Sequence, residues 1–153
     1  MSSEGRFTVM PRGGAEEVGR AGYQVDTEDN KYLVDFGIGQ TEPISYPSFQ
    51  NLEPGSIDGV FITHAHIDHI GALPLLENKG YLADEAKIFA TQPTASLAEI
   101  LLYDSLKLHK MDVEDEGIEQ KFFEDDVNQI LARFEPERYG GGKLGEGLVF
   151  KFG

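Results

Sequence analysis

The chain has 153 residues, a formal net charge of -14 and no cysteine. This length suffices for one hydrophobic core, and the lack of thiols excludes a structural zinc site built on cysteine. The acidity argues against RNA binding by this chain alone, because affinity for phosphate depends on Lys and Arg. The sequence shows no membrane-length apolar run and no signal-peptide pattern, so we expect a cytoplasmic protein without a membrane partner.

Short apolar segments near the beginning of the chain predict β-strands at 7–10, 22–26 and 31–34. The last two are expected to form a hairpin, because the residues between them favour a turn. Residues 38–56 contain three prolines and no periodicity, which predicts a long surface loop. Tyr46 is expected to anchor this loop, as is Phe49, in preference to stacking on bases.

The second half of the chain predicts helices. After a strand at 87–90, Pro93 can begin a helix that covers the sheet. A second helix is predicted to end before Pro136. The acidic segment 112–116 is expected to be a loop, and 124–126 to lie at a helix N-terminus. The apolar residues that predict the two helices are Leu97, Ile100, Leu101 and Leu108 for the first, and Phe123, Val127, Ile130, Leu131 and Phe134 for the second.

Three of the four histidines lie in the six residues 64–69, between a predicted strand at 59–63 and a short helix or turn at 70–76. Two residues separated by one position in an extended segment point to the same side, so His64 and His66 can bind one cation. Asp68 and His69 follow where the chain turns, and there they can face a second cation. Imidazole and carboxylate are ligands that zinc takes in catalytic sites, and the cluster therefore predicts a metal site.

The isolated histidine, His109, is interpreted differently from the cluster. A single histidine is more often an ordinary surface or core residue than a metal ligand. We therefore expect no metal at this position.

Residues 64–69 resemble the HxHxDH signature of the metallo-beta-lactamase superfamily. The flanking segments 13–20, 33–37 and 62–74 are similar to its beta-CASP branch, which includes ribonuclease J, the nuclease subunit of the cleavage and polyadenylation specificity factor, and archaeal relatives. The resemblance covers about residues 6 to 108 well. It implies an α/β fold, the N-terminal half of an αβ/βα sandwich with a mixed β-sheet flanked by helices.

The resemblance also implies roles for individual residues. His64 and His66 would bind the first of two zinc ions, and Asp68 and His69 the second. Asp68 would also hold the attacking water and accept its proton. Asp35 would orient ligands from behind, although a plain turn residue at the end of a strand is the alternative. The glycine-rich loop at 13–22 would lie near the metal cleft, or would simply be a turn.

The family pattern continues with a later histidine motif and a bridging aspartate, and neither follows His109. Residues 147–153 resemble the strand that precedes the later histidine motif. We therefore expect residues 1–153 to form a single partial domain with incomplete zinc occupancy and no activity by itself. One half of a sandwich leaves a sheet face open, which predicts a homodimer through that face. RNA would bind the full-length protein, and the acidity would reflect either a basic groove elsewhere or a solubility adaptation.

The resemblance therefore predicts part of a zinc-dependent ribonuclease that hydrolyses RNA phosphodiester bonds in RNA processing or decay. Two alternatives remain at this point. One is a hydrolase of the same superfamily that acts on a thioester or small ester. The other is a non-catalytic assembly module that retains the fold.

Overall fold

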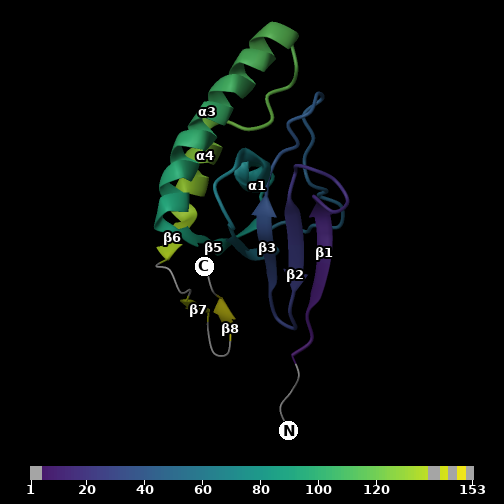
Figure 1. The fold of residues 1–153 in the computed structure, drawn as a ribbon, viewed down its shortest axis with the longest axis vertical. Helices are drawn as coiled ribbons and strands as arrows, with labels where there is room; N and C mark the ends of the chain where they lie inside the picture. The colour runs from purple at the N-terminus through teal and green to yellow at the C-terminus, as the bar shows by residue number, and fades with distance from the viewer. Residues whose placement is uncertain (1–4, 138–141, 145–147, 151–153) are drawn as a thin grey trace.

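The computed structural model describes residues 5–137, 142–144 and 148–150. A six-stranded sheet runs in chain order from β1 to β6 (Figure 1). Its first three strands are antiparallel and the remaining pairs are parallel, so the sheet is mixed, as the resemblance implied. The strands are β1 (Thr8–Gly13), β2 (Gly22–Asp26), β3 (Lys31–Phe36), β4 (Ile57–Phe61), β5 (Leu82–Thr91) and β6 (Phe134–Glu137), with β7 (Gly142–Leu144) and β8 (Leu148–Phe150) paired in a separate two-stranded sheet.

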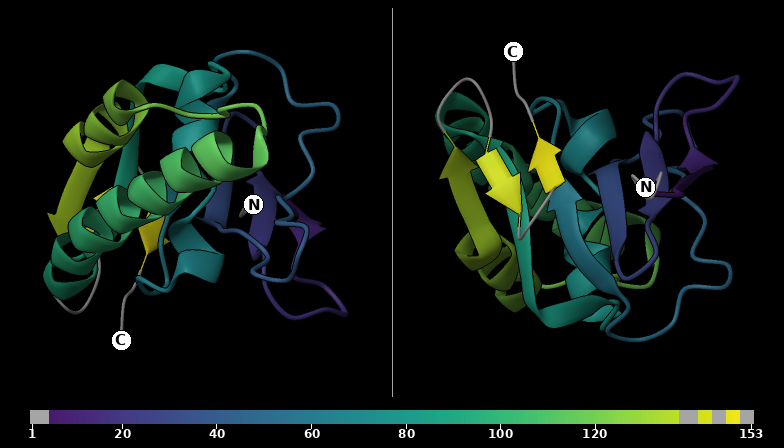
Figure 2. Two further views of the ribbon diagram at one scale, coloured as in Figure 1. Left: turned by 90° about the horizontal axis from the view of Figure 1, so that it is seen from above. Right: turned by 90° about the horizontal axis from the view of Figure 1, so that it is seen from below.

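Four helices connect the parallel strands: α1 (Ile67–Ile70), α2 (Leu73–Asn78), α3 (Gln92–Glu116) and α4 (Glu124–Arg133). Crossovers between parallel strands are right-handed, so successive crossovers in one direction place their helices on the same face of the sheet. Figure 2 shows this layer from two directions. On the helical face, Leu33, Val60 and Ile88 are in register across three strands, and each is 0% exposed. These residues form the centre of the core.

The beginning of α3 is as predicted, but its buried face is not. Pro93 lies in the first turn, yet Leu97 and Ile100 are 52% and 66% exposed. The helix instead buries Ala98 and Leu102 against the core. Apolar residues occur at helical spacing on two faces of this helix. The face with Ala98 packs inward, because the small side chain allows closer approach to the sheet.

The acidic segment 112–116 is also not the predicted loop, because it forms the last turns of α3. The helix ends at Gly117, which adopts a left-handed conformation (φ 67°) that favours glycine. The second helix agrees better with its prediction, since Val127 and Ile130 are fully buried. Phe123, in contrast, is 50% exposed and lies at the N-cap of α4, so it is not a core residue.

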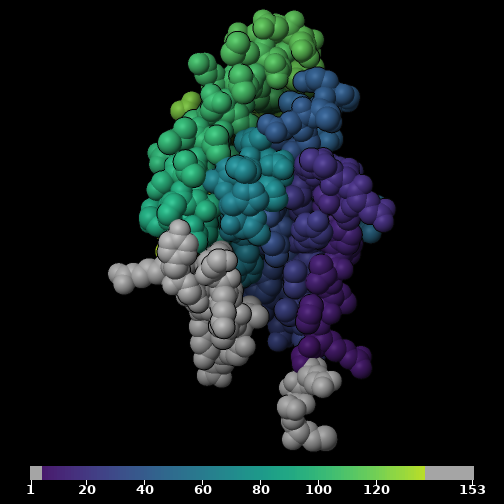
Figure 3. Space-filling view, viewed as in Figure 1, coloured from purple at the N-terminus to yellow at the C-terminus, as the bar shows by residue number. Residues whose placement is uncertain are grey.

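The long loop at 38–56 is anchored as predicted. Phe49 packs edge-on against Phe36 and stacks on Tyr81, with ring centroids 5.5 Å apart in both pairs. Tyr46 also packs against the core. At one end of the molecule this loop lies beside the C-terminal part of α3 (Figure 3). The loop is therefore held in place by core contacts and lies next to the helical layer.

Two arginines hold the same loop by its backbone. Arg12 is 5% exposed and donates from Nη1 to the carbonyl oxygens of Ser48 (2.8 Å) and Gln50 (3.0 Å). Arg20 donates from Nη1 to the carbonyl oxygen of Tyr46 (3.0 Å). The N-terminal hairpin therefore fixes a loop that lies more than 20 positions further along the chain.

The face of the sheet opposite the helices carries apolar side chains. Val9, Val25 and Tyr32 are in register across β1, β2 and β3. Val9 is 55% exposed, and the other two are half-buried. An apolar face is therefore partly exposed, and the homodimer through it remains a prediction.

Two further predictions concern the end of the chain and membranes. The final strand is found as β8, whereas 147 and 151–153 lie outside the described residues. None of the described helices combines the length and apolar character needed to cross a membrane.

Candidate metal centre

The histidine motif lies where β4 leaves the sheet. Ile62 still donates to the carbonyl oxygen of Phe89 (2.9 Å), and α1 begins at Ile67. Between them, Ala65 is buried while Thr63 and His66 are exposed. The apolar residues thus anchor the turn in the core, and the polar residues are directed to the surface.

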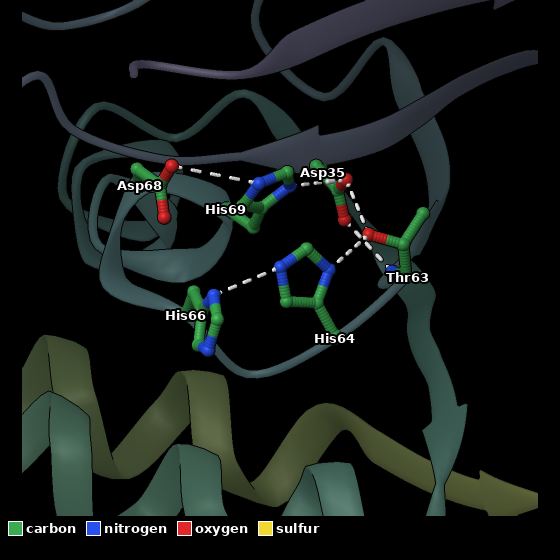
Figure 4. A network of polar contacts seen from close by, with 6 residues as sticks. All are labelled: Asp35, Thr63, His64, His66, Asp68 and His69. Atoms are coloured by element: carbon green, nitrogen blue, oxygen red, sulfur yellow. Dashed lines mark hydrogen bonds and ion pairs between the residues drawn. The ribbon is translucent and has the colours of Figure 1, made fainter. Parts of the chain in front are cut away.

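The four predicted ligands converge in two pairs (Figure 4). His64 Nε2 lies 3.1 Å from His66 Nδ1. Asp68 Oδ2 lies 3.6 Å from His69 Nε2. The rings of His64 and His69 are also adjacent, with centroids 4.0 Å apart. The four side chains therefore lie together, and their assignment to two zinc ions remains a prediction.

Asp35 lies behind these pairs and is 3% exposed. Its Oδ2 is 2.8 Å from His69 Nδ1. Its Oδ1 accepts a hydrogen bond from the backbone N–H of Thr63 (2.8 Å), and Oδ2 accepts one from the Thr63 hydroxyl (2.7 Å). Asp35 has a positive φ of 57°, a left-handed conformation that aspartate and asparagine adopt more readily than most residues.

Thr63 was not among the predicted site residues. Its hydroxyl contacts Asp35 and also lies 2.9 Å from His64 Nδ1. The only signal in the sequence is its position directly before the first histidine of the motif. Sequence periodicity assigns it simply to the end of a strand.

The environment of His64 favours its neutral form. Partial burial lowers the pKa of His64, and the neighbouring imidazoles of His69 and His66 lower it further, against the opposing effect of Asp35 and Asp68. A neutral imidazole is the form that binds a metal, because a ring nitrogen must offer a lone pair.

Backbone contacts hold the turn that carries Asp68. Its carbonyl oxygen accepts a hydrogen bond from the N–H of Ala21 (2.9 Å). Gly37 packs so closely that a Cβ atom there would overlap the same carbonyl group. Ala21 ends the glycine-rich loop between β1 and β2, so that loop borders the motif, as the resemblance implied.

The donor pairs fit a metal ion in type and spacing. Two nitrogens bound to one tetrahedral zinc at about 2.0–2.1 Å lie about 3.3 Å apart, close to the His64–His66 separation. Two donors on one ion cannot be more than about 4.2 Å apart, and Asp68 with His69 satisfies this limit. Within the described part of the chain, no three donors surround a common point. Each pair therefore supplies two donors, fewer than the four that a tetrahedral zinc ion takes.

His109 lies outside this cluster, in α3. It is 7% exposed, its Nε2 accepts the backbone N–H of Lys121 (2.9 Å), and its ring stacks on Phe122 with centroids 4.8 Å apart. This histidine is therefore part of the core.

Comparisons with known proteins agree with this fold. Residues 19–84 match the family model described as "Metallo-beta-lactamase superfamily". A structure of an archaeal metallo-beta-lactamase superfamily protein from Sulfolobus tokodaii is similar over 90% of this chain and 50% of its own, with a TM-score of 0.52 and 21% identity. At this identity the likeness concerns the fold.

Curated relatives share more sequence. A ribonuclease of Thermus thermophilus is 34% identical over 135 residues, which cover 86% of this chain and 28% of the relative. Cleavage and polyadenylation specificity factor subunit 3-I of Arabidopsis thaliana is 33% identical over 132 residues, 85% of this chain and 18% of the relative. The chain thus spans less than a third of the length of either relative. The family match over residues 19–84 and the curated relatives therefore identify the chain as similar to the metallo-beta-lactamase superfamily, whose fold it has.

Proposed function

We propose that this chain supplies half of the metal site of a zinc-dependent ribonuclease of the beta-CASP type, which hydrolyses phosphodiester bonds in RNA. The observation that carries the proposal is the convergence of four donors in two pairs in front of one buried carboxylate. The names of the curated relatives, a ribonuclease and a cleavage factor subunit, support RNA as the substrate.

The side chains divide the work as follows. His64 and His66 would hold one ion, and Asp68 and His69 would hold the other. Bound zinc ions supply Lewis acidity and lower the pKa of a water molecule. The Asp68 carboxylate, about 30% exposed, would position the attacking water and accept its proton. Asp35 orients His69 through the contact at Nδ1 and leaves Nε2 directed to the front of the site.

The net negative charge of the chain opposes RNA binding, so basic residues elsewhere must supply the affinity for phosphate. With 27 acidic and 13 basic residues, its surface repels the RNA backbone. We therefore propose that the chain acts as part of a longer protein, in which further residues complete both coordination spheres and bind RNA. The short span of the chain on its relatives supports this interpretation.

Zinc content tests the site directly. After zinc loading and desalting, elemental analysis should find zinc on the 153-residue chain and a large loss in His66→Ala. The matched control is His109→Gln, which removes an imidazole outside the cluster and retains an acceptor for the Lys121 N–H. Equal zinc in all three chains would contradict the assignment of the ligands.

Activity requires a complete site. We would replace the matching 135 residues of the Thermus thermophilus ribonuclease with this chain and check folding by circular dichroism. The chimera should cleave labelled RNA and not thioesters, and His66→Ala should abolish cleavage. Hydrolysis of thioesters but not RNA would indicate a different hydrolase.

The non-catalytic alternative has one observation in its favour, since the described residues contain no three-donor group. A folded chimera with neither bound zinc nor RNA cleavage would support an assembly module.

A further inference from the structure

The Thr63 hydroxyl lies between two groups of the site. It is 2.7 Å from Asp35 Oδ2 and 2.9 Å from His64 Nδ1. Both distances are those of good hydrogen bonds. The hydroxyl therefore links the buried carboxylate of Asp35 to His64. Among the described residues, no direct hydrogen bond joins Asp35 and His64.

The chemistry of these groups fixes the direction of each bond. A carboxylate only accepts hydrogen bonds, whereas a hydroxyl has one hydrogen to donate and lone pairs that accept. Thr63 donates its hydrogen to Asp35 and can then only accept from His64. The proton of neutral His64 must therefore be on Nδ1.

We propose that Thr63 is a positioning residue that selects the Nδ1–H tautomer of His64 and so leaves the lone pair on Nε2. This nitrogen is the one that lies 3.1 Å from His66 Nδ1, at the first donor pair. The tautomer itself is a property of the metal-free chain. Its use for metal binding rests on the proposed function.

His69 provides an internal control for His64. His69 contacts Asp35 without an intermediate, whereas His64 reaches it through Thr63. Loss of the hydroxyl should therefore change His64 and leave His69 in place. Thr63 is exposed, and its backbone N–H bond to Asp35 does not need the side chain, so substitutions here should preserve the fold.

Long-range proton–nitrogen NMR of the metal-free chain, at a pH at which imidazoles are neutral, reports the tautomer of each ring. Wild type and Thr63→Ser should show His64 with the proton on Nδ1. Thr63→Val, which has nearly the same shape, should show the Nε2–H form, with His69 unchanged. A wild-type His64 protonated on Nε2, or an unchanged tautomer in Thr63→Val, would overturn the inference.

Zinc affinity, measured by competition with a chelator, separates this inference from the proposed function. Thr63→Val should bind zinc about 10-fold more weakly than wild type, and Thr63→Ser should restore binding. Absence of zinc binding in all three chains, with the tautomers as expected, would refute the proposed metal site and support the positioning role. Equal zinc affinity in wild type and Thr63→Val would overturn the role in metal binding.

Discussion

Polar side chains in the motif contact mainly one another, whereas those of His109 and Arg133 in the helical layer contact mainly the backbone. Around the motif, Asp35, Thr63 and His64 contact one another through their side chains. In the helical layer, His109 accepts a backbone N–H, and Arg133 donates to three backbone carbonyl groups. Polar groups that bind the backbone hold the fold together. Polar groups that orient one another leave ring nitrogens and carboxylate oxygens available to a ligand.

The largest effect is expected from Arg133→Ala. Arg133 pairs with Glu77 at 2.7 Å, and the two side chains are 18% and 11% exposed. Removing the guanidinium leaves a nearly buried carboxylate and several carbonyl oxygens without a partner. We expect a loss of about 3 kcal/mol in the free energy of unfolding, measured with urea.

Lys110→Ala is the control for this substitution. Lys110 pairs with Glu124 at 3.8 Å, and both side chains are largely exposed. We expect a change of less than about 1 kcal/mol. Similar losses in both variants would contradict a structural role for the Arg133 contacts.

Asp35→Asn should weaken the motif rather than the fold. Asparagine tolerates the left-handed backbone at this position, but it removes the charge that orients His69 and binds Thr63. We expect zinc affinity to fall about 10- to 100-fold, or about 1.4–2.7 kcal/mol. Asp58→Asn, at the other end of β4, also removes a carboxylate and should leave zinc affinity unchanged. Equal effects in both variants would assign the loss to net charge alone.

His109→Gln should produce a smaller effect, on stability alone. We expect a loss of about 1 kcal/mol at neutral pH, because the stacking on Phe122 is removed. Burial lowers the pKa of His109 in the folded chain, so the unfolded chain takes up a proton more readily.

The lowered pKa of His109 determines how the stability difference between wild type and His109→Gln depends on pH. The contribution of neutral His109 to stability is complete above the unfolded pKa of about 6.5 and decreases as the pH falls below it. The difference in unfolding free energy between wild type and His109→Gln should therefore shrink in acid. A difference that grows in acid would contradict this sign.

The smallest effect is expected for self-association through the open face of the sheet. If that face forms a homodimer, Val9→Asp should raise the dissociation constant about fivefold, since the edge strand β1 would place a charge beside an apolar contact. Light scattering over a concentration series measures this. Val18→Asp introduces the same charge at a residue that is 98% exposed in the loop after β1, and it should have no effect. A wild-type chain that stays monomeric at high concentration would refute the homodimer.

The strands and the motif could be predicted because their signals are local. The hairpin of β2 and β3, the strand before His64 and the end of α4 before Pro136 all follow from neighbouring residues. The predicted metal ligands also lie within six positions, so their grouping could be predicted with little knowledge of the rest of the fold.

Long-range packing accounts for the errors. Leu101 and Leu102 are adjacent, and each belongs to an apolar stripe along α3, but only Leu102 is fully buried. The choice between the stripes depends on how the sheet lies against the helix. Thr63 was missed for a similar reason, because its role requires Asp35, which lies 28 positions earlier in the chain.

Gly37 has a consequence for the redesign of this site. The proposed donor atoms belong to side chains, and a library that varies residues 64–69 would test which of them affect metal affinity. The turn that carries Asp68 instead packs against a position that has no side chain, because even alanine at 37 would push against the Asp68 carbonyl group. Selection can therefore change the side chains of residues 64–69 one at a time, whereas Gly37 can accept no side chain without moving the Asp68 turn.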